Sequence, residues 1–587
     1  MFLRSKSRIK DGKVHRYWSV VENRRVRDGR VVQRQVLYLG EINDSQARAW
    51  RRSIEVFADG HDKPQQLTLF AESPSAPMAD DAVVQVRVGE VSVERPRQWG
   101  GCWLAQEIWD QLALDSFWRR RLPPSRQDTR WLNVFKTLVF YRLLDPGSEW
   151  RLHRHWFEVS AMGDLLGEDI GLVQIDKLYR CLDRLLVHKR DFFSHLKTRW
   201  QSLFAARFDV LLYDLTSTYF EADPAQQDGL RRFGYSRDKR SDCVQVVIAL
   251  IVTPDGLPLA YEVMPGNTAD NATLTDFLER IAAQYGRANR TWVMDRGIPT
   301  EASLATMRAA AEPIHYLVGT PKGRLTRMEK AFLELPWERV RGSIEVKLLR
   351  QDGELYVLAK SAGRMSKERA MRCRRLKKLW ARLGELRQQK LTRDQLLMKV
   401  GAAKKDAGRV FGLVAVRRPR KNQAVTPETF SYSLRKDKLR AVRRREGRYL
   451  LRTNLDSTDP AELWRYYVQL TEIEQAFKEL KSDLAIRPIY HQRDDRIEAH
   501  IFVAFVAYCL MVTLKQRLRL LAPGLTPRAV LEKLTAIQMV DIRLPTTDGR
   551  HIVLSRYTQP DRQQQFLLQN LKLTLPPQPS PKITNKT

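Results

Sequence analysis

The chain has few cysteines, and none of them is arranged for metal binding or pairing. Its 587 residues contain five Cys, which are far apart and form no CxxC pair. This pattern argues against a zinc finger and a disulfide framework, and it is typical of a reducing compartment. The sequence also lacks a phosphate-binding loop of the form GxxxxGK[ST], so an ATP-driven activity has no support.

Long apolar segments are scarce as well. The first residues, MFLRSKSRIKDGK, contain no apolar stretch of the kind that signal peptides carry. The longest apolar run, Ile501–Leu514, is too short to span a bilayer and predicts a buried core helix. We therefore expect a cytoplasmic protein with no membrane partner.

Acidic residues are outnumbered, and this imbalance points to a partner. The chain has 101 Lys and Arg against 68 Asp and Glu, which gives a net charge of +33 and a pI near 10.1. So large a surplus favours a polyanion, and nucleic acid is the commonest one. Hydrophobic residues make up 43% of the chain, so it is globular and long enough for several domains.

The N-terminal third divides into three parts. Residues 1–60 predict a small basic β-rich module with a short helix after it, and residues 61–97 predict a linker and a strand. The first forty residues hold eleven Lys and Arg against three acids, which fits either a solvated hairpin or an arm that contacts DNA. Helical periodicity runs through residues 98–200, which we interpret as a helical domain with a possible DNA-binding role.

The remainder alternates strands and helices. Residues 205–320 predict three meandering strands followed by helix, strand, helix and strand, the order of an RNase H-like mixed α/β sheet. In that order the first and fourth strands are neighbours. Residues 321–455 predict a long inserted β-rich and basic domain, and 456–520 the second part of the core. Residues 521–587 predict a C-terminal segment that could dimerise and that ends in a disordered tail.

Three carboxylates stand in contexts that such a fold would bring together. Asp214 ends an apolar run in FDVLLYDLTSTYFE, Asp295 ends another in RTWVMDRGI, and Glu474 lies in the helical stretch WRYYVQLTEIEQAFKELKSDL. Taken singly, each has an ordinary explanation, since an Asp at a strand end often caps a turn. Together they can hold two Mg²⁺, or Mn²⁺ in their place, for phosphodiester cleavage. Two histidines, His491 and His500, are interpreted as structural.

Several blocks resemble those of bacterial insertion-sequence DDE transposases. They occur in the family's order: DLTSTYFE, GYSRDKRSDCVQVV, PLAYEVMPGNTAD, MDRGI and YVQLTEIEQAFKELK. The last is similar to the family's Tyr-x2-Arg-x3-Glu-x6-Lys signature, with Tyr467, Glu474 and Lys481 in register. Position 470 is Leu instead of Arg. The resemblance covers residues 200–320 and 440–520.

The resemblance implies a cut-and-paste transposase whose Asp214, Asp295 and Glu474 cleave transposon ends and join them to target DNA. It also implies that Tyr467 and Lys481 contact terminal phosphates from one helical face. Leu470 cannot bind a phosphate there, and Arg465 or Lys478 could do so in its place. The implied partners are the terminal inverted repeats, the target DNA and a second copy of the chain. The implied location is the bacterial cytoplasm or nucleoid.

Further DNA-binding candidates are basic residues near these acids or in the insertion. They are Arg237, Lys239, Arg240, Arg296, Arg372, Arg375 and Lys378. Each could instead be a solvated surface cation. Two other functions stay open from the residues alone: an inactive or domesticated protein that only binds transposon ends, and an RNase H-like nuclease of repair or restriction type.

Overall fold

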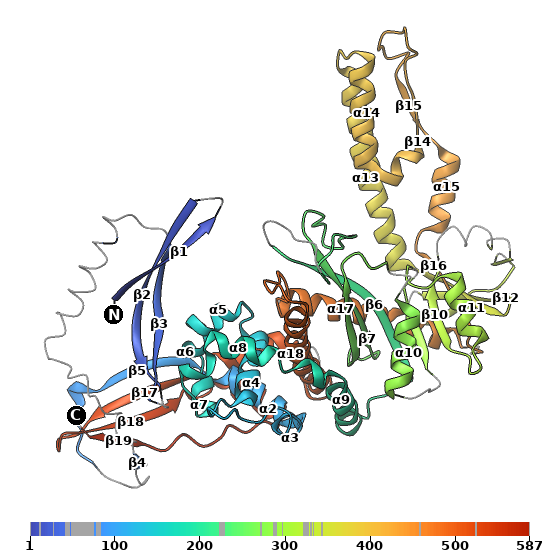
Figure 1. Cartoon of the computed structure of the whole chain (residues 1–587). Helices are drawn as coiled ribbons and strands as arrows, with labels where there is room; N and C mark the ends of the chain where they lie inside the picture. Colours follow the sequence, from blue (N-terminus) through green and yellow to red (C-terminus); the bar gives the residue numbers. More distant parts are fainter. Residues whose placement is uncertain are drawn as a thin grey trace.

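The computed structural model in Figure 1 describes most of the chain. The described residues are 2–10, 13–26, 29–40, 47, 76–77, 84–221, 229–269, 273–285, 290–295, 297–320, 328, 331–332, 334–341, 344–456, 459–522 and 525–585. They form a mixed α/β structure with one large sheet, three smaller sheets of two, three and five strands, and a helical region between the large sheet and the three- and five-stranded sheets.

The N-terminal module is a three-stranded antiparallel sheet. Its strands are β1 (Phe2–Lys10), β2 (Lys13–Arg25) and β3 (Val31–Gly40), in that spatial order. The chain reverses between β2 and β3 at Gly29, whose positive φ of 77° suits a residue without a side chain. The short helix expected after this sheet lies almost wholly outside the described residues.

Helices fill the region predicted to be helical. They are α2 (Gly100–Gln111), α3 (Leu114–Arg119), α4 (Trp131–Leu144), α5 (Glu149–Arg151), α6 (Phe157–Val159), α7 (Met162–Leu166), α8 (Ile175–Leu182) and α9 (Lys189–Phe204). They pack around α18 (Asp494–Leu521), which contains the apolar run Ile501–Leu514. This helix is long and apolar enough to cross a membrane, but 94% of its apolar window is buried inside the protein. It is the core helix that the sequence predicted.

The large sheet has nine strands in the order β11-β12-β13-β16-β10-β9-β6-β7-β8. The strands between 205 and 320 are β6 (Val210–Tyr219), β7 (Gln245–Val252), β8 (Pro258–Pro265), β9 (Thr291–Met294) and β10 (His315–Gly319). Helices α10 (Leu274–Tyr285) and α11 (Glu301–Ala309) connect the later strands. The meander is antiparallel, and β6 pairs in parallel with β9. The expected adjacency of first and fourth strands is therefore present.

The structure corrects the extent of the insertion. Strands β11 (Glu338–Arg341), β12 (Ile344–Gln351), β13 (Glu354–Ser361) and β16 (Arg448–Thr453) continue the large sheet instead of forming a separate domain. The reason is that β16 pairs with both β10 and β13. Sequence patterns alone do not reveal such long-range pairing.

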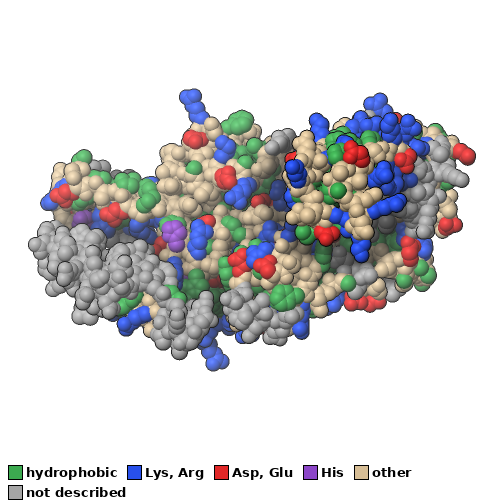
Figure 2. All heavy atoms as spheres, turned by 90° about the horizontal axis from the view of Figure 1, so that it is seen from above, with side chains coloured by type: hydrophobic (Ala, Val, Ile, Leu, Met, Phe, Trp, Pro, Cys, Tyr) green, Lys and Arg blue, Asp and Glu red, His purple; other side chains and the backbone are tan. Residues whose placement is uncertain are grey.

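Between β13 and β16 the chain leaves the sheet as a projecting arm (Figure 1). The arm comprises α13 (Ala362–Gln388), α14 (Arg393–Ala407), β14 (Val414–Arg417), β15 (Ser431–Leu434) and α15 (Lys436–Arg445). It has its own apolar core, which includes Leu379, Leu383, Leu396 and Phe430. Seen from above in Figure 2, Lys and Arg side chains gather where this arm projects.

The C-terminal region forms a sheet with segments from before the helical region. Its strands are β17 (Gln538–Pro545), β18 (Arg550–Tyr557), β19 (Lys582–Asn585), β5 (Ser92–Gln98) and β4 (Ala76–Pro77). The tail predicted to be disordered thus contains a strand, because β19 pairs with β18 and β4.

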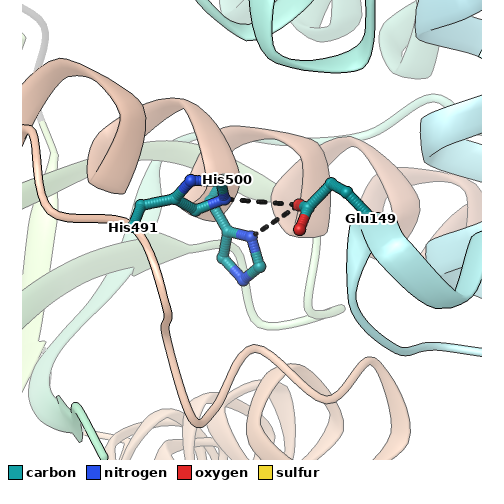
Figure 3. Close-up of side chains that lie close together, drawn as sticks. All are labelled: Glu149, His491 and His500. Carbon is teal, nitrogen blue, oxygen red and sulfur yellow. Dashed lines mark hydrogen bonds and ion pairs between the residues drawn. The ribbon is translucent and has the colours of Figure 1, made fainter. Parts of the chain in front are cut away.

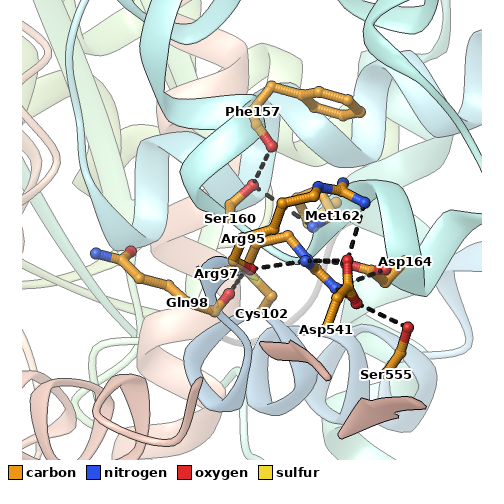
Figure 4. A network of polar contacts seen from close by, with 10 residues as sticks. All are labelled: Arg95, Arg97, Gln98, Cys102, Phe157, Ser160, Met162, Asp164, Asp541 and Ser555. Carbon is orange, nitrogen blue, oxygen red and sulfur yellow. Dashed lines mark hydrogen bonds and ion pairs between the residues drawn. The ribbon is translucent and has the colours of Figure 1, made fainter. Parts of the chain in front are cut away.

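A buried arginine fastens this sheet to the helices (Figure 4). Arg97, on β5, lies 2.6 Å from Asp164 on α7 and 2.9 Å from Asp541 on β17. The hydroxyl of Ser555 donates to Asp541 as well, at 2.8 Å. Because a buried guanidinium needs compensating charge, the two carboxylates hold three chain segments together.

The apolar stretch near the C-terminus is not a free surface. Leu567 and Leu568, on α20 (Arg562–Asn570), and the following Leu571 are buried in the main core. The side chain of Arg517 also reaches from α18 to the carbonyl of Leu571, at 2.5 Å. Because this stretch packs onto its own chain, its buried leucines are not exposed for the dimer contact suggested for residues 521–587.

Candidate active site

The first acidic residue, Asp214, lies within β6 and not at its end. The parallel pairing of β6 with β9 ends at Tyr213 opposite Met294. Asp214 and Asp295 therefore follow the last paired residues on adjacent strands. Because parallel strands present equivalent positions side by side, this register brings the two acids to one place.

Glu474 approaches the same place from a helix. It lies on α17 (Leu470–Lys478), which packs against β6 and β7. The apolar residues Ile473, Ala476 and Phe477 are buried and seat the helix, whereas Glu474 is exposed. The amphipathic spacing of α17 thus directs its acid away from the core.

The charges of the other two acids act on Asp214. Asp214 is half-buried, and its Oδ1 accepts a hydrogen bond from the backbone N–H of Leu215 at 2.8 Å. The pKa of Asp214 is raised to about 7, mainly because burial disfavours its charged form. The Leu215 hydrogen bond and the charge of Arg237 oppose this rise, and the charges of Asp295 and Glu474 add to it.

This donor set suits hard divalent cations. Three carboxylates that repel one another gain from a shared cation, and oxygen ligands match Mg²⁺ and Mn²⁺. Among the described residues, the one set of three potential ligands whose atoms all lie within 4.8 Å of one another is elsewhere, at Glu149, His491 and His500. The three acids therefore face one region without forming so compact a cluster.

The signature segment is not one regular helix. Gln469, in a turn, separates α16 (Pro460–Val468) from α17, and a π-helical turn follows at Glu479–Asp483. The expectation that Tyr467 and Lys481 lie on one helical face assumed a regular helix, and the structure has two irregularities between these positions. Single π-turns inside helices are frequent at functional sites.

The signature residues consequently have different surroundings. Tyr467 is half-buried beside Tyr449 and Trp464, with ring centroids 6.1 Å from both. Leu470 packs against the main apolar core, so an apolar residue suits its position. Arg465 and Lys478 are exposed.

Lys481 lies in an ion cluster. Its Nζ is 3.0 Å from Oδ1 of Asp238, and a guanidinium nitrogen of Arg487 is 2.6 Å from the same oxygen. The pKa of Lys481 is lowered by burial, against the effect of Asp238, and the charges of Arg487 and Arg237 lower it further. Arg487 was not among the DNA-binding candidates named from the sequence, although it follows closely after Lys481.

The basic loop between β6 and β7 supplies three of the DNA-binding candidates. Arg237 is half-buried, and its charge acts on both Asp214 and Lys481. Lys239 is exposed. Arg240 is held inside the loop by ion pairs with Glu221 at 3.0 Å and Asp242 at 2.9 Å. Because these two ion pairs engage its guanidinium, Arg240 stabilises the loop, and DNA binding is at most its second role.

The DNA-binding candidates in the arm differ in exposure. Arg375 and Lys378 are exposed on α13. Arg372 is buried and pairs with Glu446, with Nε 2.5 Å from Oε1. Arg372 is therefore a structural residue, which corrects its assignment to DNA binding. Arg296 lies outside the described residues.

A second polar cluster lies within the core (Figure 3). His491 Nε2 and His500 Nδ1 both lie 3.3 Å from Oε1 of Glu149, and Arg142 lies 3.9 Å from that oxygen. Arg142 compensates the buried carboxylate, so a metal ion is not needed there. The structural role expected for His491 and His500 stays a prediction, and both rings contact the same carboxylate.

Comparisons with known proteins identify the family. The model of the transposase DDE domain matches residues 208–510, and that of the IS1634 family transposase N-terminal domain matches residues 3–64. A comparison with curated proteins gives no match.

Two solved structures show weak similarity. The piggyBac transposase synaptic complex with hairpin DNA has a TM-score of 0.34 and 9% identity, over 74% of this chain and 76% of that one. The Mos1 transposase paired-end complex with left transposon end has a TM-score of 0.14 and 12% identity, over 48% and 68%. Neither likeness carries an argument, whereas the DDE-domain match alone spans more than half of the chain. This chain belongs to the insertion-sequence DDE transposases, which cleave DNA and transfer its strands.

Proposed function

We propose that Asp214, Asp295 and Glu474 are the catalytic residues of this transposase and the ligands of its divalent cations. The observation that carries the proposal is the strand register: Asp214 and Asp295 directly follow the last paired residues of the adjacent strands β6 and β9, and α17, which carries Glu474, packs against β6. Strands β8, β7, β6, β9 and β10, in that spatial order, would form an RNase H-like core around them.

Mg²⁺ is the cation that we assign, and Mn²⁺ can substitute for it. A pair of such ions activates the attacking oxygen and stabilises the leaving oxygen in phosphodiester cleavage. The chain supplies the charge and the geometry: strand register fixes Asp214 beside Asp295, and helix α17 brings Glu474 to them. Arg237, whose charge acts on Asp214, would add positive charge near the scissile phosphate.

The DNA partners are the terminal inverted repeats of the element and its target, joined by cut-and-paste transposition in the bacterial cytoplasm or nucleoid. Exposed Lys239, Arg375 and Lys378 would contact phosphates, as would Lys481 and Tyr467 near the acids. Two chains would act together on a pair of ends, because each end needs a catalytic site.

Isosteric variants test the catalytic assignment. Asp214→Asn, Asp295→Asn and Glu474→Gln should each lower end cleavage in Mg²⁺ by about a thousandfold or more, because each removes a cation ligand worth several kcal/mol in the transition state. Binding of the same DNA in Ca²⁺ should persist.

Glu472→Gln is the matched control. Glu472 lies on α17 and pairs with Lys515 at 2.9 Å and Arg519 at 3.3 Å, so its replacement removes an acid from the same helix without removing a ligand. Normal cleavage by Glu474→Gln, or an equal decrease in Glu472→Gln, would show that the assignment is wrong.

A further inference from the structure

Two cations hold one carboxylate beside the candidate catalytic acids. Asp238 accepts from Lys481 through both carboxylate oxygens, at 3.0 and 3.1 Å, and from Arg487 at 2.6 Å. The charge of Arg237, the preceding residue, lowers the pKa of Lys481. Lys481 and Arg487 together carry two positive charges, and Asp238 carries one negative charge.

The cluster is shielded from water. The side chains of Lys481, Asp238 and Arg487 are 11%, 15% and 26% exposed. In such surroundings an ion pair is stronger than on the surface, and a cation without a partner costs several kcal/mol. An anion between Lys481 and Arg487 therefore stabilises the cluster, and a phosphate can supply that charge as Asp238 does.

The cluster is also adjacent to the proposed catalytic site. Arg237 influences both Asp214 and Lys481, and its backbone N–H donates to the hydroxyl of Ser217 on β6 at 3.3 Å. The guanidinium of Arg487 lies 5.7 Å from the ring of Tyr219, the last residue of β6. If one phosphate of a DNA strand lay at the catalytic acids, the neighbouring phosphates of that strand would lie close to this cluster.

We propose that Lys481 and Arg487, with Arg237, form a single phosphate-binding site, and that Asp238 occupies it until a DNA phosphate takes its place. The inference rests on the proposed function of Asp214, Asp295 and Glu474. It assigns Arg487 as a phosphate ligand and Asp238 as an internal competitor.

The exchange is chemically balanced. A phosphodiester carries one negative charge, as the Asp238 carboxylate does, and its two free oxygens can accept from the same donors. A guanidinium binds such oxygens through two parallel hydrogen bonds, which an ammonium cannot do. Arg487 thus provides the site with the kind of group that the signature has at position 470, where this chain has Leu470.

Only the loop tip needs to move. The base of the loop is fixed by Gln245, whose side-chain amide donates to the carbonyls of Tyr235 at 3.1 Å and Gly266 at 2.9 Å. Lys239, next to Asp238, has a positive φ of 61°, a strained conformation for a residue with a side chain. Release of Asp238 would let this strain relax.

Affinity measurements in Ca²⁺ test the exchange without requiring cleavage. The probe is a duplex made from the DNA that flanks the coding sequence, with a random duplex of equal length for comparison. Asp238→Asn should bind the flanking duplex about tenfold more tightly, because the competitor is gone. Arg487→Gln and Lys481→Gln should each bind it about tenfold more weakly.

Asp548→Asn is the matched control for charge. Asp548 pairs with Arg550 in the C-terminal sheet, so this variant also removes one acid from an Asp–Arg pair. Its affinity should equal that of the wild type. An equal increase in affinity in both Asn variants, or no increase in Asp238→Asn, overturns the proposal.

DNA with single uncharged methylphosphonate linkages gives a second readout, which a folding defect would not reproduce. Such linkages are introduced one position at a time near the cleavage site. At one position the substitution should lower the affinity of the wild-type protein for the DNA and leave the affinity of Arg487→Gln unchanged. Sensitivity to the same substitutions in both proteins overturns the assignment of Arg487. Failure of the catalytic assignment would appear only in cleavage, so the two proposals can be separated.

Discussion

A single buried carboxylate joins the helical region to the core helix. Glu149 belongs to α5, and it accepts from His500 on α18 and from His491 just before that helix. Burial opposes ionisation of Glu149, but the two histidine hydrogen bonds outweigh it and hold the pKa of Glu149 well below its usual value. Burial also lowers the pKa of His500 to about 4, so this histidine is neutral at pH 7.

Both shifts make the protein less stable in acid. Between pH 6.5 and 4 the unfolded chain binds a proton at His500 that the folded chain does not, so unfolding becomes easier as pH falls through this range. The ionised Glu149 stabilises the fold above its unfolded pKa, and this contribution disappears on further acidification. For His500 the full effect is about 3 kcal/mol.

We therefore expect His500→Asn to flatten the decline of the thermal midpoint between pH 6.5 and 4. The exposed His155 provides a control, and His155→Asn should keep the wild-type decline. Glu149→Gln should destabilise the protein at pH 7, by about 3 to 5 kcal/mol, because it leaves Arg142 without a compensating charge. An unchanged pH profile in His500→Asn would contradict this account.

At the residue scale, the sequence indicated the acids but not their partners. Asp214, Asp295 and Glu474 follow recognisable patterns because strand register and helical spacing act over a few residues. Arg372 was misassigned because its partner, Glu446, lies on the far side of the arm in sequence. Arg487 was missed for the same reason, since its contact with Asp238 depends on tertiary structure.

Helix α13 carries a run of exposed positive charge along the projecting arm. Residues 364–378 contain eight Lys and Arg and one Glu. Arg375 and Lys378 are exposed one turn apart, whereas Leu379 and Leu383 on the same helix are buried in the arm's own core. The helix thus keeps its basic side chains outward while its apolar side holds the arm together.

Neutralising both cations should reduce DNA binding through phosphate contacts. For Arg375→Gln with Lys378→Gln, the slope of log affinity against log salt should fall by about two, since each phosphate contact contributes roughly 0.9. The double variant Arg543→Gln with Arg562→Gln, which removes exposed cations near the C-terminal sheet, should keep the wild-type slope. Equal slopes in all three proteins would exclude the arm as a DNA contact.

At the element scale, local patterns predicted β6 to β10, their helices and α18, because period and turn residues define such elements. They did not predict the breaks around α17, where Gln469 and the turn Glu479–Asp483 interrupt a continuous helical pattern. Nor did they predict β19, whose pairing with β4 joins residues near 76 to residues near 583. Both outcomes depend on packing between distant segments.

The whole molecule is strongly basic and extended, with the arm at one end and the three- and five-stranded sheets at the other (Figure 1). Its net charge of +33 makes free chains repel one another. The apolar residues of the C-terminal segment, Leu567, Leu568 and Leu571, are buried within the chain, so they do not offset that repulsion. DNA would neutralise the charge and bring chains together.

We therefore predict a monomer without DNA and a complex of two chains on a pair of transposon ends. Because joining both ends to one target requires a catalytic site at each end, the smallest active assembly should contain two sets of Asp214, Asp295 and Glu474. Light scattering of the protein alone, and with flanking DNA in Ca²⁺, gives both masses. Mixing wild type with Glu474→Gln on paired ends should yield complexes cut at one end only. Complete cutting of both ends by single-chain complexes would show that one catalytic site serves both, and a stable dimer without DNA would show that charge does not control assembly.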